Sequence, residues 1–203
     1  GFDNLHVVAR GVDTHVFNPN KRKAHLREQW QADEHTVVLL SVGRLAPEKN
    51  LHLIVNTYKA LKKNNRPVKL VFAGDGPFRS KLQADCPDAI FMGMLNQNQL
   101  AEVYASADLF LFTSVTETFG NVTLEALACG TPVLAFDCAA ASDLIDDGYN
   151  GWLVQGEDPQ RFVLKALAAT ENSDTVKLAR QHAHASILHW DWSQIASQVE
   201  GLF

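Results

Sequence analysis

The chain alternates short apolar runs with stretches of helical periodicity. Runs rich in Val, Leu, Ile and Phe have the length of buried strands and occupy residues 37–42, 68–73, 89–92, 109–112, 133–136 and 152–154. Between them, residues 51–61 and 100–104 carry apolar side chains three and four positions apart, as on one face of a helix. After Pro159 the pattern predicts helices to about residue 169, from about 174 to 188, and from 193 onward.

Strands that alternate with helices predict right-handed crossovers around a parallel sheet covered on both faces. We therefore expect an α/β fold with a Rossmann-like doubly wound sheet. One domain over residues 1–203 is expected, because 46% hydrophobic content suffices for a single core and no linker or repeat interrupts the pattern. The chain begins at Gly1 without an initiator Met, ahead of a strand-like run at 5–9, so we expect it to be a piece of a longer protein.

The charge balance argues against a surface built for nucleic acid. The net charge is −5 and the pI is near 5.9, whereas nucleic-acid binding rests on clustered Lys and Arg. The one short basic cluster, at 21–23, is interpreted as a solvated loop or a helix start. No apolar stretch approaches the roughly 20 residues that span a bilayer, and we expect no signal peptide.

Cysteine and histidine spacing predicts neither disulfides nor a metal site. Cys86, Cys129 and Cys138 are odd in number and lack a C-x-x-C spacing, so we expect a reducing, cytoplasmic location. His182 and His184 are two residues apart and so point to different sides of a helix, and no His-Glu-x-x-His pattern occurs.

The most informative segment joins the apolar run 109–112 to a stretch of helix formers. Glu117 follows the predicted strand, and Glu125 lies eight positions later on the predicted helix, which Gly130 ends. The backbone N–H groups of the first helical residues are unpaired and attract a phosphate; they belong to Phe119, Gly120, Asn121 and Val122. Glu117 as a solvated loop residue, and Glu125 as an acid that complements the helix dipole, stay open as alternatives.

Three further segments follow predicted strands and should meet the glutamates at the same edge of the sheet. After 37–42, Gly43 permits close backbone approach, and Arg44 and Lys49 supply two cations for a diphosphate, although a solvated loop explains them as well. After 68–73, Gly74 opens a tight turn. After 89–92, a loop at 93–97 could form the wall for a flat ring; its apolar residues are Met94 and Leu95.

The ordered set of these motifs resembles the C-terminal, donor-binding half of the retaining nucleotide-sugar glycosyltransferases of family 4, which have the two-domain GT-B fold. The resemblance covers nearly the whole chain, from Arg10-Gly-Val-Asp and Phe17-Asn-Pro to Gly130-Thr-Pro-Val and Asp147-Gly with Asn150-Gly. It departs from the family at 139–143, Ala-Ala-Ala-Ser-Asp, where many relatives have Gly-Gly followed by a small residue, Pro and Glu.

The resemblance implies that Arg44 and Lys49 contact the donor diphosphate, that Glu117 contacts the transferred sugar and that Glu125 binds the ribose. Whether Glu117 takes part in the chemistry or only positions the sugar stays open. Implied donor-binding residues are Gly43, Arg44, Lys49, Gly74, Met94, Leu95, Glu117, Thr118, Phe119, Gly120, Asn121, Val122 and Glu125. The implied substrate is a UDP- or GDP-sugar, and no metal is expected, since the chain lacks an Asp-x-Asp triplet.

The implied activity is transfer of a hexosyl group to a lipid or saccharide acceptor, with retention of configuration. The acceptor domain would be N-terminal to this chain, so we expect the isolated chain to bind donor without full activity. Association of the full-length enzyme with the inner face of the membrane stays open. The segment 187–203, with Trp190 and Trp192, is expected either at the domain junction or in the core.

Two other functions compete with this interpretation. A dinucleotide-dependent oxidoreductase shares the sheet type, but Gly43 begins no G-x-G-x-x-G fingerprint. A non-catalytic nucleotide-binding or sugar-binding regulatory module is the second, and the presence of Arg44, Lys49, Glu117 and Glu125 together disfavours it.

Overall fold

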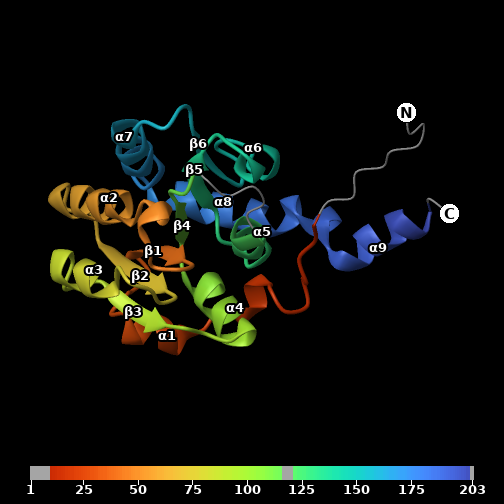
Figure 1. Ribbon diagram of the computed structural model, residues 1–203, viewed down its shortest axis with the longest axis horizontal. Helices are drawn as coiled ribbons and strands as arrows, with labels where there is room; N and C mark the ends of the chain where they lie inside the picture. The colour runs from red at the N-terminus through yellow and green to blue at the C-terminus, as the bar shows by residue number, and fades with distance from the viewer. Residues whose placement is uncertain (1–9, 116–120, 202–203) are drawn as a thin grey trace.

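The computed structural model of the protein describes residues 10–115 and 121–201. Its centre is a six-stranded sheet in the order β3-β2-β1-β4-β5-β6, with every neighbouring pair parallel (Figure 1). This confirms the predicted doubly wound sheet, and the order reverses between β1 and β4. The strands are β1 Val37–Val42, β2 Val68–Ala73, β3 Ile90–Gly93, β4 Leu109–Phe112, β5 Val133–Phe136 and β6 Gly151–Val154.

Helices cover both faces of this sheet (Figure 1). They are α1 Ala24–Gln29, α2 Leu51–Lys63, α3 Arg79–Asp85, α4 Gln97–Ser106, α5 Asn121–Ala128, α6 Ala140–Leu144, α7 Pro159–Ala169, α8 Ser173–Ser186 and α9 Trp192–Glu200. Short 3-10 turns are η1 Pro19–Lys21, η2 Pro47–Lys49 and η3 Leu188–Trp190. Caps visible in the sequence set several starts: Asn96 and Gln99 form a capping box on α4, and Asp158 caps α7 ahead of Pro159.

Alternate side chains of each strand supply two separate layers of core. On β1, Val38 and Leu40 face α1, α4, α5 and α6, whereas Leu39 faces α2, α3 and α7. Helix α8 contributes to both layers, with Ala183 in the first and Val176 in the second. Because both faces are buried, the strands read as continuous apolar runs, which is why the sequence revealed them.

Element bounds differ from the expectations by only a few residues. Strand β3 lies one residue later than the run 89–92, and α8 starts at Ser173 and ends at Ser186, before the separate turn η3. The spacing of apolar residues did not reveal α1, α3 or α6, which are five to seven residues long and therefore too short to show periodicity. The alternative of a helix start at 21–23 was the one signal for α1. The strand-like run at 5–9 lies outside the described residues.

The two ends of the described chain are joined. Trp192 donates its backbone N–H to Val12 O (3.2 Å), and Val12 donates to Trp190 O (2.9 Å). Trp190 packs partly buried against the core, while Trp192 is 51% exposed on α9, which extends away from the sheet and its helices (Figure 1). In the described part of the chain, no helix combines the length and the apolar character needed to cross a membrane.

Candidate functional site

Three loops meet at the carboxyl edge of β1, β2 and β3. Gly43 donates its backbone N–H to Ala73 O (3.0 Å), and Gly74 donates to Gly93 O (2.7 Å). Both Gly43 and Gly74 have positive φ, at 135° and 130°. A Cβ on Gly74 would lie 2.0 Å from Gly43 O, so this close approach requires glycine. The predicted turn at Gly74 is therefore a contact between two loops.

A central cavity of about 250 Å³ lies where the strand order reverses, between the ends of β1 and β4. Gly43, Arg44 and Lys49 line it from the β1 side, and Val122, in the first turn of α5, lines it from the other. Arg44 is exposed, with Nη1 3.9 Å from Glu48 Oε1. Two predicted cations and the start of α5 thus meet at one cavity, as the sequence analysis expected.

Two residues of this cavity were not assigned a role from the sequence, Thr113 and Ser114. Buried Thr113 lies directly after β4, and its Oγ1 is 2.8 Å from Lys49 O, to which it donates, so the end of β4 holds η2 and the backbone of Lys49 in place. Ser114 is 4% exposed and lines the cavity, and its Oγ has no hydrogen-bond partner within the described structure. A buried hydroxyl without a partner is unusual, and this one belongs to a residue that lines the cavity.

A second, more apolar hollow of about 400 Å³ adjoins the central cavity, because Gly43 and Arg44 line both. Its other walls are Val42, Ala73, Gly74, Asp75, Met94, Leu95 and Leu100. Met94 is 78% exposed, so its thioether side chain is available to a ligand. The predicted ring-binding wall is therefore next to the two cations.

Asp75 is the acid at the edge of this apolar hollow. It accepts a hydrogen bond from Gly76 N (2.7 Å) and forms an ion pair with Arg79 (2.8 Å). These contacts, the backbone hydrogen bond first, lower the pKa of the Asp75 carboxyl, so it stays ionised.

Glu125 lies on α5, as predicted, but lines a different hollow of about 170 Å³ together with Asn121, Asp13 and Trp192. Its carboxylate accepts a hydrogen bond from Tyr104 Oη (3.2 Å). Burial raises the pKa of Glu125, which the Tyr104 hydrogen bond partly offsets. The central cavity and this hollow flank the start of α5, since Val122 lines one and Asn121 the other.

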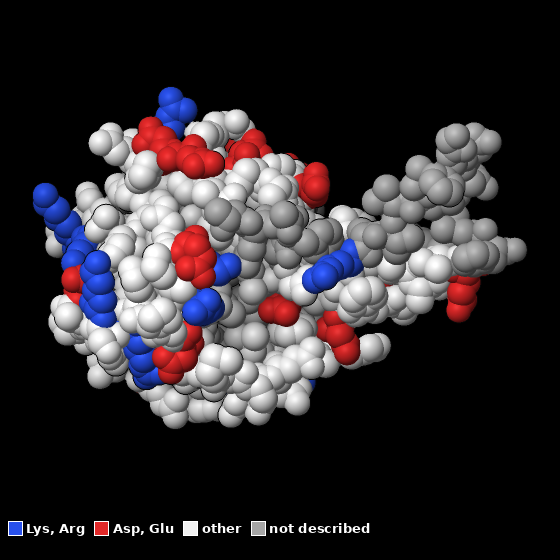
Figure 2. Space-filling view, viewed as in Figure 1, with Lys and Arg blue, Asp and Glu red and all other residues white. Residues whose placement is uncertain are grey.

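The remaining predicted site residues are Glu117, Thr118, Phe119 and Gly120, and they lie outside the described residues. The described part of the site comprises two basic residues, the N-terminal turn of α5 and an apolar hollow. Figure 2 shows acidic and basic side chains interleaved over the middle of the face in view. The arrangement suits one compact ligand that carries a diphosphate and a flat ring.

Comparison with known proteins identifies relatives of this chain. The model of the family described as Glycosyl transferases group 1 matches residues 22–185. A GDP-mannose-dependent alpha-mannosyltransferase of Mycobacterium tuberculosis is 36% identical over 202 residues, which cover 99% of this chain and 51% of the relative. The chain therefore spans about half the length of this relative.

Solved structures share the fold. HepE of Anabaena in complex with UDP superposes with a TM-score of 0.81 at 24% identity, covering 97% of this chain and 56% of that one. The C-terminal domain of a glycosyl transferase group 1 family protein, LpcC, of Francisella tularensis superposes with a TM-score of 0.71 at 24% identity. That match covers 87% of this chain and 96% of the solved domain.

Proposed function

Because the chain belongs to the glycosyl transferases group 1 family, we propose that it is the donor-binding half of a retaining transferase of family 4 that moves a hexosyl group from a nucleoside-diphosphate sugar. The observation that carries this proposal is the central cavity, where Arg44, Lys49 and the first turn of α5 meet at the point where the strand order reverses. An acceptor-binding domain N-terminal to this chain would complete the enzyme.

The diphosphate is proposed to occupy the central cavity. Cleavage of the bond from the anomeric carbon leaves negative charge on the diphosphate, and Arg44, Lys49 and the N-terminus of α5 would stabilise that charge more in the transition state than in the ground state. The Ser114 hydroxyl would supply a further hydrogen bond, which accounts for its lack of a partner in the described structure. In this mechanism the chain's own cations provide the electrostatic stabilisation, and no metal takes part.

The nucleobase is proposed to lie in the apolar hollow, against Met94 and Leu95, and to stack there between apolar walls. Glu125 is proposed to bind the ribose hydroxyls across the start of α5. Glu117 is proposed to contact the transferred sugar. The first donor to test is GDP-mannose, which the mycobacterial relative uses.

We further propose a cytoplasmic location for the full-length enzyme, with its acceptor, a lipid or a saccharide, reached at the inner face of the membrane. Three free cysteines, Cys86, Cys129 and Cys138, support a reducing compartment.

The test is calorimetric titration of the chain with GDP, UDP, GDP-mannose, UDP-glucose and NAD. Arg44→Ala and Lys49→Ala should each weaken nucleoside-diphosphate binding by about 1.5–3 kcal/mol, because each removes a charge-assisted contact. That loss corresponds to roughly 10- to 150-fold in Kd. Circular dichroism and thermal melting should show that both variants remain folded.

Glu48→Gln is the matched control, since Glu48 lies beside Arg44 but is not proposed to contact the ligand. It should leave the affinity unchanged or raise it slightly, because it frees Arg44 from a competing carboxylate. Unchanged affinity in both Arg44→Ala and Lys49→Ala would remove the diphosphate assignment, and binding of NAD alone would favour an oxidoreductase.

A further inference from the structure

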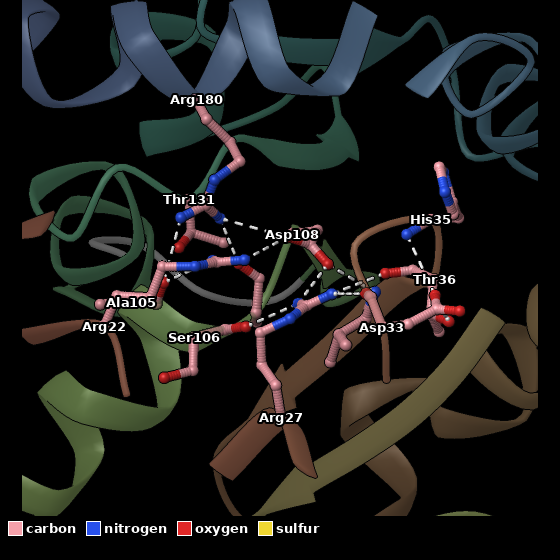
Figure 3. A network of polar contacts seen from close by, with 12 residues as sticks. Arg22, Arg27, Asp33, His35, Thr36, Ala105, Ser106, Asp108, Thr131 and Arg180 are labelled. Carbon is pink, nitrogen blue, oxygen red and sulfur yellow. Dashed lines mark hydrogen bonds and ion pairs between the residues drawn. The ribbon is translucent and has the colours of Figure 1, made fainter. Parts of the chain in front are cut away.

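A second group of basic side chains lies at the opposite edge of the sheet. Arg22, Arg27 and Arg180 converge on Asp108, the residue just before β4, and we call these four residues the arginine cluster (Figure 3). Asp108 also accepts a hydrogen bond from Val38 N (2.9 Å), near the start of β1. The cluster is therefore at the amino ends of the strands, away from the donor cavities at their carboxyl ends.

The cluster has more positive than negative charge. Arg27 Nη1 lies 2.7 Å, Arg22 Nη2 3.4 Å and Arg180 Nη1 3.8 Å from a carboxylate oxygen of the same aspartate. Within the described structure, no other carboxylate lies within ion-pair distance of these guanidinium groups. One carboxylate thus faces three cations.

Part of this excess has a structural explanation. Arg22 and Arg180 both donate to Ala105 O (3.0 Å each), and Arg27 donates to Ser106 O (3.1 Å), so the arginines cap the carbonyl end of α4. A helix C-terminus carries only about half a negative charge, which does not neutralise two extra cations. Burial lowers the pKa of Arg180 to about 10. Repulsion from Arg22 and Arg27 adds to this effect, and the attraction of Asp108 opposes it.

The guanidinium groups also line an open hollow of about 200 Å³. Lys177 and Ser173 from the first two turns of α8 line the same hollow, so a helix N-terminus faces it as well. Its lining contains four cationic side chains against Glu34 and Asp108, and Lys177 has an exposed partner, Asp174, at 3.5 Å. A neighbouring hollow of about 630 Å³ shares Arg22, Lys177 and Arg180.

We propose that the hollow of about 200 Å³ binds a small phosphate oxyanion, either free phosphate or diphosphate. Arg22, Arg180, Lys177 and the start of α8 would hold it. Guanidinium groups attract phosphate through their charge and through charge-assisted N–H···O bonds, and an oxyanion would neutralise the excess charge that the cluster carries in a chain of net charge −5. The site is distinct from the donor cavity, from which the length of the sheet separates it.

The test is a titration of the ¹⁵N-labelled chain with inorganic phosphate and with diphosphate, followed by NMR, which resolves the two edges of the sheet. Backbone amides of Val38, Ser173 and Lys177 should shift together along one binding curve. Amides of Gly43 and Val122 report the donor cavity separately. Phosphate should also raise Tm, because the ligand binds the folded state.

Arg22→Gln and Lys177→Gln should each raise the Kd for phosphate, measured from the shift of the Val38 amide, by about tenfold. Both side chains are partly exposed, so the variants should fold. Arg161→Gln is the matched control. Arg161 pairs with Asp158, three positions before it, at 3.5 Å, just as Lys177 pairs with Asp174. The control should leave the curve unchanged, and none of the three should change GDP affinity.

Three outcomes would overturn the proposal. No shift at Val38, Ser173 and Lys177 would remove the site, and equal weakening by Arg161→Gln would reduce it to non-specific charge. If the chain sedimented with vesicles of phosphatidic acid but its amides did not respond to free phosphate, the cluster would instead bind a lipid headgroup. Loss of GDP binding in Arg44→Ala leaves this inference untouched, so the two proposals fail separately.

Discussion

At the scale of single residues, the carboxyl edge of the sheet depends on two glycines that lie side by side in space but differ in their surroundings. Gly43 and Gly74 have nearly the same φ, 135° and 130°. A Cβ on Gly43 would meet nothing within 4 Å, whereas one on Gly74 would strike Gly43 O at 2.0 Å. Alanine substitutions at the two positions therefore distinguish the cost of backbone strain from the cost of a steric clash.

Gly43→Ala should destabilise the chain by about 1–3 kcal/mol, because it adds only the strain of a positive φ. Gly74→Ala adds a collision with backbone, and should cost about 2–4 kcal/mol and also displace the loop that carries Arg44. Urea unfolding of both variants measures the difference. Equal losses would mean that the two loops separate freely, and that the contact does not shape the site.

Glu125 is the residue where stability and the proposed function oppose each other. Burial raises its pKa, so the folded state favours the protonated form; the associated stability is present below the unfolded value, about 4.3, and is lost as pH rises through the folded value. At neutral pH the carboxylate is consequently a net cost to folding. A role in binding the donor ribose would account for a carboxylate at this buried position.

Glu125→Gln should therefore raise Tm at pH 7 while lowering nucleotide affinity. The amide can still accept from Tyr104 Oη, and a gain of ~1 kcal/mol corresponds to about 2–4 °C in a chain of this size. The gain should shrink as pH falls toward 4, because the wild-type carboxyl is then protonated. Thermal melts between pH 4 and 8 measure it, and a lower Tm at pH 7 would contradict the assignment of burial as the dominant effect.

At the scale of elements, the sheet and the long helices could be predicted because their signals are local. Buried strands such as Leu109–Phe112 are apolar throughout, and α2 repeats its apolar side chains with helical spacing. Short helix α6 left no such signal, and it follows Ala139, whose φ of 49° is rare for an alanine.

The candidate site was predictable only in part for the same reason. Arg44, Lys49, Met94 and Leu95 each follow a recognisable strand, so their convergence followed from topology. The contact from Thr113 to the backbone of Lys49 joins residues that are 64 positions apart, and no sequence spacing encodes it.

The arginine cluster shows this limit most clearly, because its side chains join α1, α4, α8 and the start of β4 by contacts between residues far apart in the sequence. The basic run at 21–23 was interpreted as a solvated loop or a helix start, and Lys23 is indeed the N-cap of α1. The contacts of Arg22 with Ala105 O and Asp108 were not predicted. Arg27, Asp108 and Arg180 lie far apart in the sequence, and nothing in their spacing indicates that they meet.

Asp108→Asn should cost about 3–5 kcal/mol, because it removes the only carboxylate that the described structure places within ion-pair distance of the three arginines. Asparagine keeps an acceptor for Val38 N, so the loss reports charge. Glu102→Gln is the control. It breaks the more exposed ion pair between Glu102 and Lys23 (3.6 Å) and should cost about 0–1 kcal/mol. Similar losses in denaturant unfolding would mean that the cluster acts as surface ion pairs.

At the scale of the whole molecule, the two ends of the described chain form one unit, from which α9 extends away from the core (Figure 1). Asp191 joins them: its carboxylate accepts from Thr14 N (3.1 Å) and Thr14 Oγ1 (2.5 Å), and it caps α9 by accepting from Ser193 N (2.8 Å). Trp192 and Ile195 of α9 pack at the position of Gly11, where a Cβ would lie 2.9 Å from Trp192. Of the two expectations for 187–203, the exposed Trp192 fits the domain junction and the partly buried Trp190 fits the core.

Asp191→Ala should release α9 while leaving the core intact. Hydrogen bonds from Ser193 and Thr14 lower the pKa of Asp191, so its stabilising effect is present above the unfolded value, about 3.9, and is lost as pH falls through the folded value. Loss of a helix N-cap costs about 0.5–2 kcal/mol, and here this affects a single helix. Amide hydrogen exchange should accelerate across 192–200 in the variant, and in the wild type below about pH 4, while global Tm changes little.

Asp158→Ala supplies the comparison, since Asp158 caps α7 with the same two-residue geometry but contacts neither chain end. Its faster exchange should be confined to α7. If Asp191→Ala instead lowered protection throughout the sheet, the end unit would be part of the cooperative core. If it changed nothing in 192–200, the contacts of Trp192 and Ile195 with Gly11 would hold α9 by themselves, and a partner domain would meet a helix that is already fixed in place.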